Sequence, residues 1–176
     1  MKIIIPMSGF GERFKSAGYR LPKPLILVDK KPIIVHVIEM FGITNDFIFI
    51  CNKEHLERTN MHSILKKYAP NNKIISIEPH KKGPVFAVSK AFEFIDDNEK
   101  VIVNYCDFCC YWNFSSFIKW STKNKSDGAI PSYRGFHPHS LGSTNYAYLK
   151  LEKDRVFGVQ EKKPFTQNKM DEFASS

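Results

Sequence analysis

The chain has 176 residues, of which 43% are hydrophobic and 25% are charged, and this size and balance fit one compact globular domain. The net charge of +8 allows three interpretations, namely nucleic-acid binding, a solvated lysine-rich surface or attraction of a polyanionic small substrate. No apolar stretch is long enough to cross a bilayer, and the first strand-like residues do not have the length of a signal peptide. We therefore expect a cytoplasmic protein without nucleic-acid or membrane partners.

Short apolar runs alternate with helical patterns along most of the chain. In chain order, the sequence predicts strand 2–6, helix 32–41, strand 46–51, helix 53–68, strand 73–78, helix 83–95, strand 101–105, helix 114–123 and strand 128–133. Strands that alternate with helices indicate a mainly parallel sheet with helices on both faces. The predicted fold class is therefore a three-layer α/β/α sandwich.

The pattern changes near residue 145. Residues 145–151 and 155–160 are strand-like and flank a short polar turn, so they predict an antiparallel pair. The last residues, 167–176, are polar, and we expect them to form a tail after a domain that spans residues 1–166.

Four cysteines raise the question of a metal or redox site. They are Cys51, Cys106, Cys109 and Cys110, and in a reducing cytosol they should be free thiols. No cysteine or histidine partner stands at zinc-like spacing from the cluster at 106–110. The sequence therefore favours buried, small hydrophobic side chains.

The strongest functional signal is PMSGFGERF at residues 6–14, followed by PKPL at residues 22–25. Glycines after a first strand let backbone N–H groups approach phosphate oxygens, and ligands of open α/β sheets bind beyond the strands' carboxyl ends. The stretch is neither a dinucleotide-binding loop nor a Walker loop, because Phe14 replaces the third glycine and no Gly-Lys-Ser/Thr occurs. Arg13 and Lys23 complete the set.

These residues resemble the signature G-x-G-x-R, then P-K-P-L, of the nucleotidyltransferase family that makes nucleotide sugars. The resemblance spans nearly the whole chain in the expected order. EPHKKGP at residues 78–84 is similar to the family's base-binding segment, Asp107 stands where the family has a metal-binding aspartate, and Glu161-Lys162 is similar to its acceptor-binding pair. The resemblance implies a fold of the nucleotide-diphospho-sugar transferase type that is shortened at its C-terminal side.

The resemblance also implies a role for each matching residue. The nucleotide-binding residues would be Met7, Ser8, Gly9, Gly11, Glu78 and Gly83. Arg13 and Lys23 would be catalytic, the first because its planar fork suits the β- and γ-phosphates, the second because it can bridge the attacking phosphate and the α-phosphate. Asp107 would bind the cofactor Mg²⁺ as a hard oxygen ligand, and Glu161 and Lys162 would bind the acceptor.

The implied activity is transfer of a nucleotidyl group from an NTP to a phosphorylated acceptor, a sugar 1-phosphate by default, with release of pyrophosphate. The product would feed synthesis of surface polysaccharide such as capsule, and the protein could act as an oligomer.

Three alternatives remain: a cytidylyltransferase for a non-sugar phosphate such as phosphocholine, an inactive nucleotide-binding module, and a glycosyltransferase. The module is considered because the family's later metal-binding aspartate has no counterpart here. Asp107-Phe108-Cys109 weighs against the glycosyltransferase, since that class typically has Asp-x-Asp.

Three further residues bear on specificity. The family often has glutamine where this chain has Glu78, and an ionised carboxylate only accepts hydrogen bonds, which favours the amino group of cytosine and hence CTP. The alternative is that Glu78 points to solvent at a strand end and pairs with Lys81 or Lys82. His137 and His139 flank a proline, and they either line the acceptor pocket or belong to an ordinary loop.

Overall fold

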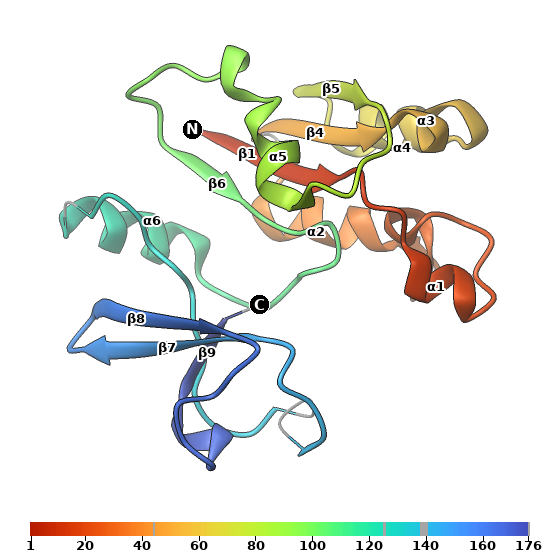
Figure 1. Cartoon of the computed structure of the whole chain (residues 1–176). Coiled ribbons are helices and arrows are strands. Elements are labelled where there is room, and N and C mark those ends of the chain that lie inside the picture. Colours follow the sequence, from red (N-terminus) through yellow and green to blue (C-terminus); the bar gives the residue numbers. More distant parts are fainter. Residues whose placement is uncertain (44, 125, 138–140, 176) are drawn as a thin grey trace. The chain divides into compact units, whose positions relative to one another are not determined.

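Figure 1 shows the structure, a computed structural model that describes residues 1–43, 45–124, 126–137 and 141–175. The chain divides into two compact units, Met1–Trp112 and Asn113–Ser176. The boundary expected after residue 166 thus lies inside the second unit, and the tail expected beyond it contributes a strand to that unit's sheet.

The regular elements follow one another in the order in which they are labelled in Figure 1, with 3-10 helices marked η. The first unit contains β1 (Lys2–Met7), α1 (Glu12–Ser16), η1 (Lys23–Leu25), β2 (Leu27–Val28), β3 (Lys31–Pro32), α2 (Ile33–Phe41), β4 (Asp46–Asn52), α3 (Lys53–Arg58), α4 (Met61–Tyr68), β5 (Asn72–Ile77), α5 (Gly83–Ser89), η2 (Phe92–Phe94) and β6 (Val101–Val103). The second unit contains α6 (Phe114–Lys123), β7 (Ala147–Glu152), β8 (Arg155–Glu161), η4 (Lys169–Asp171) and β9 (Phe173–Ser175).

The first unit is built on a four-stranded sheet with the order β5-β4-β1-β6, and every neighbouring pair is parallel. The central strands β1 and β4 are buried along almost their whole length, whereas the edge strand β6 is partly exposed. Central strands of a parallel sheet need near-continuous apolar runs because helices cover both faces. The parallel α/β arrangement expected from the sequence is confirmed.

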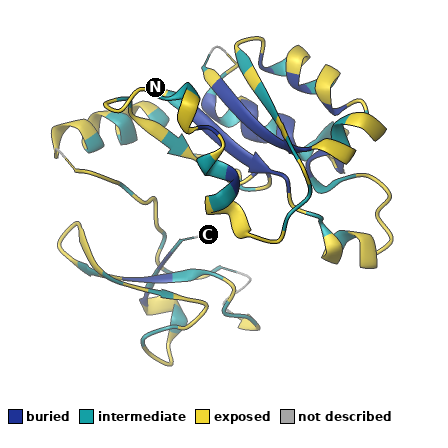
Figure 2. Ribbon diagram, turned by 45° about the horizontal axis from the view of Figure 1, so that its top comes forward, coloured by how far each residue is buried: buried dark blue, intermediate teal, exposed yellow. Residues whose placement is uncertain are grey.

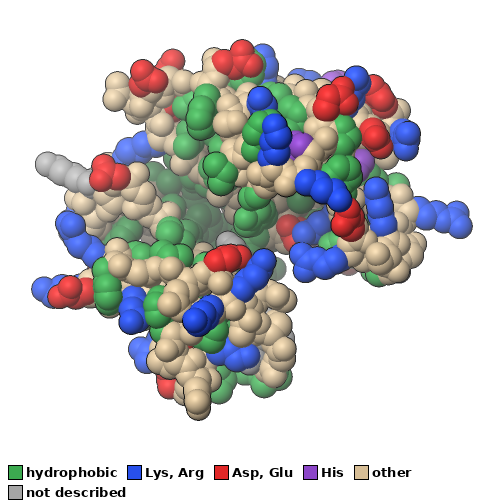
Figure 3. Space-filling view, in the orientation of Figure 1, with side chains coloured by type: hydrophobic (Ala, Val, Ile, Leu, Met, Phe, Trp, Pro, Cys, Tyr) green, Lys and Arg blue, Asp and Glu red, His purple; other side chains and the backbone are tan. Residues whose placement is uncertain are grey.

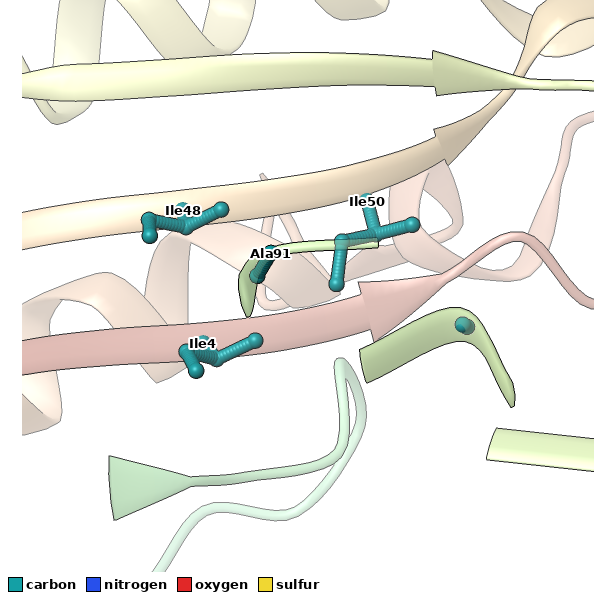
Figure 4. Packing of buried hydrophobic residues seen from close by; sticks show 5 residues of the cluster. Ile4, Ile48, Ile50 and Ala91 are labelled. Atoms are coloured by element: carbon teal, nitrogen blue, oxygen red, sulfur yellow. The ribbon is translucent and has the colours of Figure 1, made fainter. Parts of the chain in front are cut away.

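The core of this unit lies on both faces of the sheet. On one face, Ile4 of β1 and Ile48 and Ile50 of β4 pack with Ala87 and Ala91, at and just after α5 (Figure 4). Successive side chains of a strand point to opposite faces. Ile3 and Ile5 of β1 and Phe49 of β4 alternate with these isoleucines and are equally buried. They therefore belong to the other face of the sheet, which α2 and α4 cover (Figure 1). Burial of apolar surface on both faces thus stabilises the sheet.

A truncation at Ile50 tests this core. Ile50 is fully buried in the cluster, so Ile50→Ala is expected to lower the free energy of unfolding by about 2–5 kcal/mol through lost burial and the remaining cavity. Urea denaturation followed by circular dichroism measures the change. The control is Val85→Ala on α5, whose side chain is 80% exposed and should change stability by about 0.5 kcal/mol at most. Equal effects of the two substitutions would contradict this packing.

Two helices differ from the sequence pattern, since one is interrupted and the other ends early. The helix predicted over residues 53–68 breaks into α3 and α4, because Thr59 adopts an extended backbone and its hydroxyl donates to the carbonyl of His55 at 2.6 Å. The helix predicted over residues 83–95 ends at Ser89, whose hydroxyl also bonds back to a backbone carbonyl, at 2.8 Å. In both cases a side-chain hydroxyl competes with the helical hydrogen bonds.

The sheet of the second unit has the order β8-β7-β9 with antiparallel pairs, so the predicted pairing of β7 with β8 is confirmed. The strand predicted over residues 128–133 is wrong. In this described segment only Tyr133 forms a bridge, with Ala174 of β9. Pro131 has no N–H to donate, which disfavours a regular ladder there.

The surface carries mixed charge. On the face seen in Figure 3, lysine and arginine side chains are interspersed with acidic ones and do not form one continuous block. Among the helices that the structure describes, none is both long and apolar enough to cross a membrane.

Candidate active site

The order of the four strands singles out one end of the sheet. β4 and β5 lie on one side of β1, and the chain then returns to place β6 on the other side. In open parallel sheets, ligands bind beyond the carboxyl ends of the strands where the order reverses. Here those are the ends of β1 and β6, followed by loops that begin at Ser8 and Asn104. Both loops contain residues that the sequence predicted to bind nucleotide or metal.

The first loop has open backbone at its two glycines. Met7 and Ser8 are buried at the end of β1, and no atom lies within 4 Å of the position that a Cβ on Gly9 would take. Gly11 has a φ of +65°, a left-handed conformation that suits glycine, and it caps the N-terminus of α1. The exposed side chain of Arg13 projects from this short helix. The loop can therefore present N–H groups and a guanidinium to an anion.

A lysine and an aspartate from distant parts of the sequence meet beside this loop. Lys23 begins η1, where the buried residues Pro24 and Leu25 anchor the backbone. Its Nζ lies 2.5 Å from Oδ2 of Asp107 and 5.3 Å from the ring centre of Phe14. The side chains of Lys23 and Asp107 are 26% and 36% exposed, so both stay accessible to a ligand. The structure thus brings together two residues that the resemblance assigned to catalysis and to metal binding.

The loop that carries Asp107 is held by the asparagine that directly follows β6. The backbone N–H of Asn104 donates to Ile4 of β1, and its side-chain amide donates to the carbonyls of Tyr105 at 2.8 Å and Phe108 at 3.0 Å. These bonds hold the turn of the loop that carries Asp107. Within the described residues, no group of three or more His, Cys, Asp or Glu side chains could hold a metal ion by itself. A cation at Asp107 would need further oxygens from a ligand.

The cysteines are free and fall into two classes. Cys51 and Cys106 are buried, and burial raises the pKa of each thiol to about 12; the Asp107 charge adds to the shift at Cys106. Cys109 and Cys110 are exposed, and partial burial raises their pKa as well. The interpretation as buried small side chains therefore holds for the first two cysteines and is wrong for the other two.

The segment after β5 contacts the glycine loop. Oγ of the buried Ser8 lies 3.2 Å from Nε2 of His80, and Lys81 forms an exposed ion pair with Glu12 at 3.8 Å. Gly83 begins α5 with a φ of +83°, a conformation that favours glycine. The predicted phosphate-binding and base-binding segments are thus neighbours in the fold.

Among the described contacts, the side chain of Glu78 has none with the glycine loop or with His80. Its side chain is 74% exposed, and Oε1 accepts from Nζ of Lys53 at 2.7 Å. This arrangement matches the alternative interpretation in kind, a solvent-facing carboxylate paired with a lysine, although the partner is Lys53 and not a lysine of its own segment.

Glu161 and Lys162 are described within the second unit. Glu161 ends β8, and Lys162 follows it with a φ of +57° and with its N–H donating to the carbonyl of Tyr146 at 3.0 Å. Their side chains are exposed and pair with each other at 3.6 Å. Their role toward an acceptor stays a prediction.

The histidine-containing loop of the second unit is described only in part. The rings of Tyr133, His137 and Tyr146 form a cluster with centre-to-centre distances of 5.3–5.9 Å. His139 lies outside the described residues. An acceptor role for this loop therefore stays untested.

The sequence pattern missed three polar residues that hold the site together, Asn52, His80 and Asn104. Asn52 ends β4 and Asn104 directly follows β6, so polar side chains at strand ends were the available signal. His80 lies inside residues 78–84, the segment that resembles the family's base-binding segment. Its contact with Ser8 depends on tertiary packing, for which no local pattern exists.

A family model described as nucleotidyl transferase matches residues 2–175. The chain belongs to the nucleotidyl transferase family. This membership agrees with the glycine, arginine and lysine signature of the first connection.

A curated relative of the family is mannose-1-phosphate guanyltransferase 2 of Candida glabrata, which is 26% identical over 168 residues. The alignment covers 89% of this chain and 46% of the relative. The chain thus spans less than half the length of this curated relative.

Solved structures show the fold of the family. A candidate glucose-1-phosphate thymidylyltransferase from Bacillus anthracis matches with a TM-score of 0.79 and 18% identity, covering 100% of this chain and 69% of that one. UDP-glucose pyrophosphorylase, solved with UDP-glucose, matches with a TM-score of 0.72 and 17% identity, covering 99% and 73%. The fold is that of the nucleotide-diphospho-sugar transferases, as the sequence predicted.

Proposed function

We propose that this protein transfers a nucleotidyl group from an NTP to a sugar 1-phosphate and releases pyrophosphate. The observation that carries the proposal is the Lys23–Asp107 pair beside the glycine loop, at the end of the sheet where this fold class binds ligands. The names of the relatives support a sugar 1-phosphate as acceptor. We further propose that the protein acts in the cytoplasm, as a monomer or an oligomer, and that its product is a precursor of surface polysaccharide.

The chemistry requires two polyanions to meet. An oxygen of the acceptor phosphate forms a bond to the α-phosphorus of the NTP, the bond from that phosphorus to the bridging oxygen breaks, and pyrophosphate leaves with the electron pair. Such a step depends on positioning and on neutralisation of charge. We assign the β- and γ-phosphates to Arg13 and the N–H groups of Gly9 and Gly11, and the α-phosphate and the attacking phosphate to Lys23. The net charge of +8 would favour capture of both substrates.

The residues at the end of β6 fit a magnesium ion. Mg²⁺ in phosphoryl-transfer sites is commonly held by one or two carboxylates together with substrate phosphates, and Asp107 supplies one accessible carboxylate. When bound, the ion would neutralise charge that develops on the phosphates. Asp107 would hold it while Asn104 keeps the loop in place.

We assign the acceptor to Glu161 and Lys162, following the resemblance of this pair to the family's acceptor-binding residues. The ammonium of Lys162 can neutralise a phosphate, and the carboxylate of Glu161 can accept from sugar hydroxyls. Their existing ion pair is exposed, so little free energy opposes an exchange of partners.

An assay for pyrophosphate tests the proposed function. The protein is incubated with each NTP, Mg²⁺ and a panel of sugar 1-phosphates and phosphocholine, and the expected result is pyrophosphate release that requires one of the sugar 1-phosphates. Release with phosphocholine alone would identify the other acceptor class. Tight NTP binding without release under any condition would favour an inactive nucleotide-binding module and overturn the proposal.

Base choice is the most specific part of the sequence-based prediction. If Glu78 accepts from the amino group of cytosine, kcat/KM should be highest for CTP, and Glu78→Gln should reduce the preference roughly 5- to 100-fold, the value of one unmet polar partner. Kinetics with the four common NTPs measure this.

The described contacts and the relatives do not support that preference. Glu78 is exposed and paired with Lys53, and the relatives are named for guanosine, thymidine and uridine chemistry. Lys53→Ala, which removes the partner of Glu78 and leaves the carboxylate, is the matched control. A preference for GTP, UTP or dTTP that Glu78→Gln does not change would eliminate a role of Glu78 in base choice.

A further inference from the structure

Ser8 is a junction between three strand ends. It follows β1 directly and is only 4% exposed. Its carbonyl accepts from the side-chain amide of Asn52, at the end of β4, at 3.4 Å. Its hydroxyl contacts Nε2 of His80, in the segment after β5, at 3.2 Å. Since β4 separates β1 from β5 in the sheet, no ladder hydrogen bond can join these two strand ends, and the contact of Ser8 with His80 does so.

The direction of this hydrogen bond follows from the other nitrogen of the ring. Nδ1 of His80 lies 3.2 Å from the backbone N–H of Lys82, which can only donate. Nδ1 must therefore accept, and the ring proton resides on Nε2. His80 consequently donates from Nε2 to the hydroxyl oxygen of Ser8.

The imidazole of His80 is also held on its flank. Its ring packs edge-on against Phe86 of α5 with 4.7 Å between ring centres. Two hydrogen bonds and one ring contact thus define the orientation of a side chain that the sequence pattern did not select. Both ring nitrogens have partners within the protein, so neither is free to bind a ligand in this arrangement.

We propose that His80 is a positioning residue that sets the spacing between the glycine loop at residues 8–11 and the segment at residues 78–83 for binding of a nucleoside triphosphate. The inference rests on the proposed function. Preorganised loops bind more tightly because less conformational freedom is lost on binding. His80 acts through Ser8 and does not itself touch the ligand.

Calorimetric titration with NTP in Mg²⁺ tests the proposal. His80→Leu removes the donor, and the expected Kd rises roughly tenfold, the value of one hydrogen bond between partly buried groups. His80→Gln restores an N–H donor at similar reach and should return Kd to near the wild-type value. Ser8→Ala should weaken binding as His80→Leu does, and the double variant should be no worse than either single one, because both remove the same bond. His62→Leu, at an exposed histidine of α4, is the matched control and should have no effect.

A second measurement does not depend on the ligand. Amide hydrogen exchange at residues 8–11 of the free protein should be faster in His80→Leu and slower again in His80→Gln. Wild-type binding that His80→Leu leaves unchanged would overturn the inference and leave the proposed function intact. Equal loss in His80→Leu and His80→Gln with additive effects of Ser8→Ala would also overturn it. A wild-type protein that binds no NTP would overturn the proposed function, and the inference with it.

Discussion

Alanine at Lys23 is expected to lower turnover on the order of 10²-fold or more, and alanine at Arg13 should have a similar effect. Both residues carry positive charge beside the glycine loop, where the proposed step brings two polyanions together. Fixed cations that stabilise charge in a transition state are commonly worth this much. Steady-state release of pyrophosphate measures the loss.

Stability separates this role from a structural one. The ion pair of Lys23 with Asp107 is partly exposed, so its removal should cost about 0–1 kcal/mol and shift Tm by only a few degrees. Lys31→Ala is the matched control, since Lys31 also forms a close ion pair, with Glu39 at 2.7 Å, but lies outside the glycine loop and the loop after β6. Full activity of Lys23→Ala would eliminate the proposed role, as would early melting that accounts for the lost rate.

The second large effect is expected at Asp107. Asp107→Asn keeps the size of the side chain and one oxygen for Lys23 but removes the negative charge that would hold Mg²⁺. Turnover should fall on the order of 10²–10³-fold, and the enhancement of NTP binding by Mg²⁺ should disappear. Calorimetry with Mg²⁺ and with EDTA measures the second effect directly.

The control for this substitution is Asp97→Asn, an exposed aspartate in the connection before β6. It removes the same charge from the same unit and should leave both turnover and the Mg²⁺ effect unchanged. Asp107→Asn with undiminished Mg²⁺ dependence would show that another residue holds the ion. In that event Lys23 and Asp107 would form a structural pair only.

Local sequence was sufficient to select the glycine loop, Arg13 and Lys23 as candidate phosphate-binding residues. Each belongs to one short stretch whose meaning depends on neighbouring residues, such as the prolines around Lys23. The central strands were equally legible, because a strand buried on both faces must be apolar throughout. The strand predicted over residues 128–133 is wrong, because Pro131 has no N–H to donate and apolar residues alone do not form a regular hydrogen-bonded ladder.

The sequence by itself determined the family, the parallel sheet and the candidate phosphate-binding residues, since these follow from short-range patterns. The tertiary structure alone decided which of them meet. It paired Lys23 with Asp107, turned Glu78 toward Lys53, and joined Ser8 to His80. Such contacts depend on the order of the strands in the sheet, which brings the carboxyl ends of β1 and β6 together. Strand order results from packing across the whole unit, and no local stretch of residues encodes it.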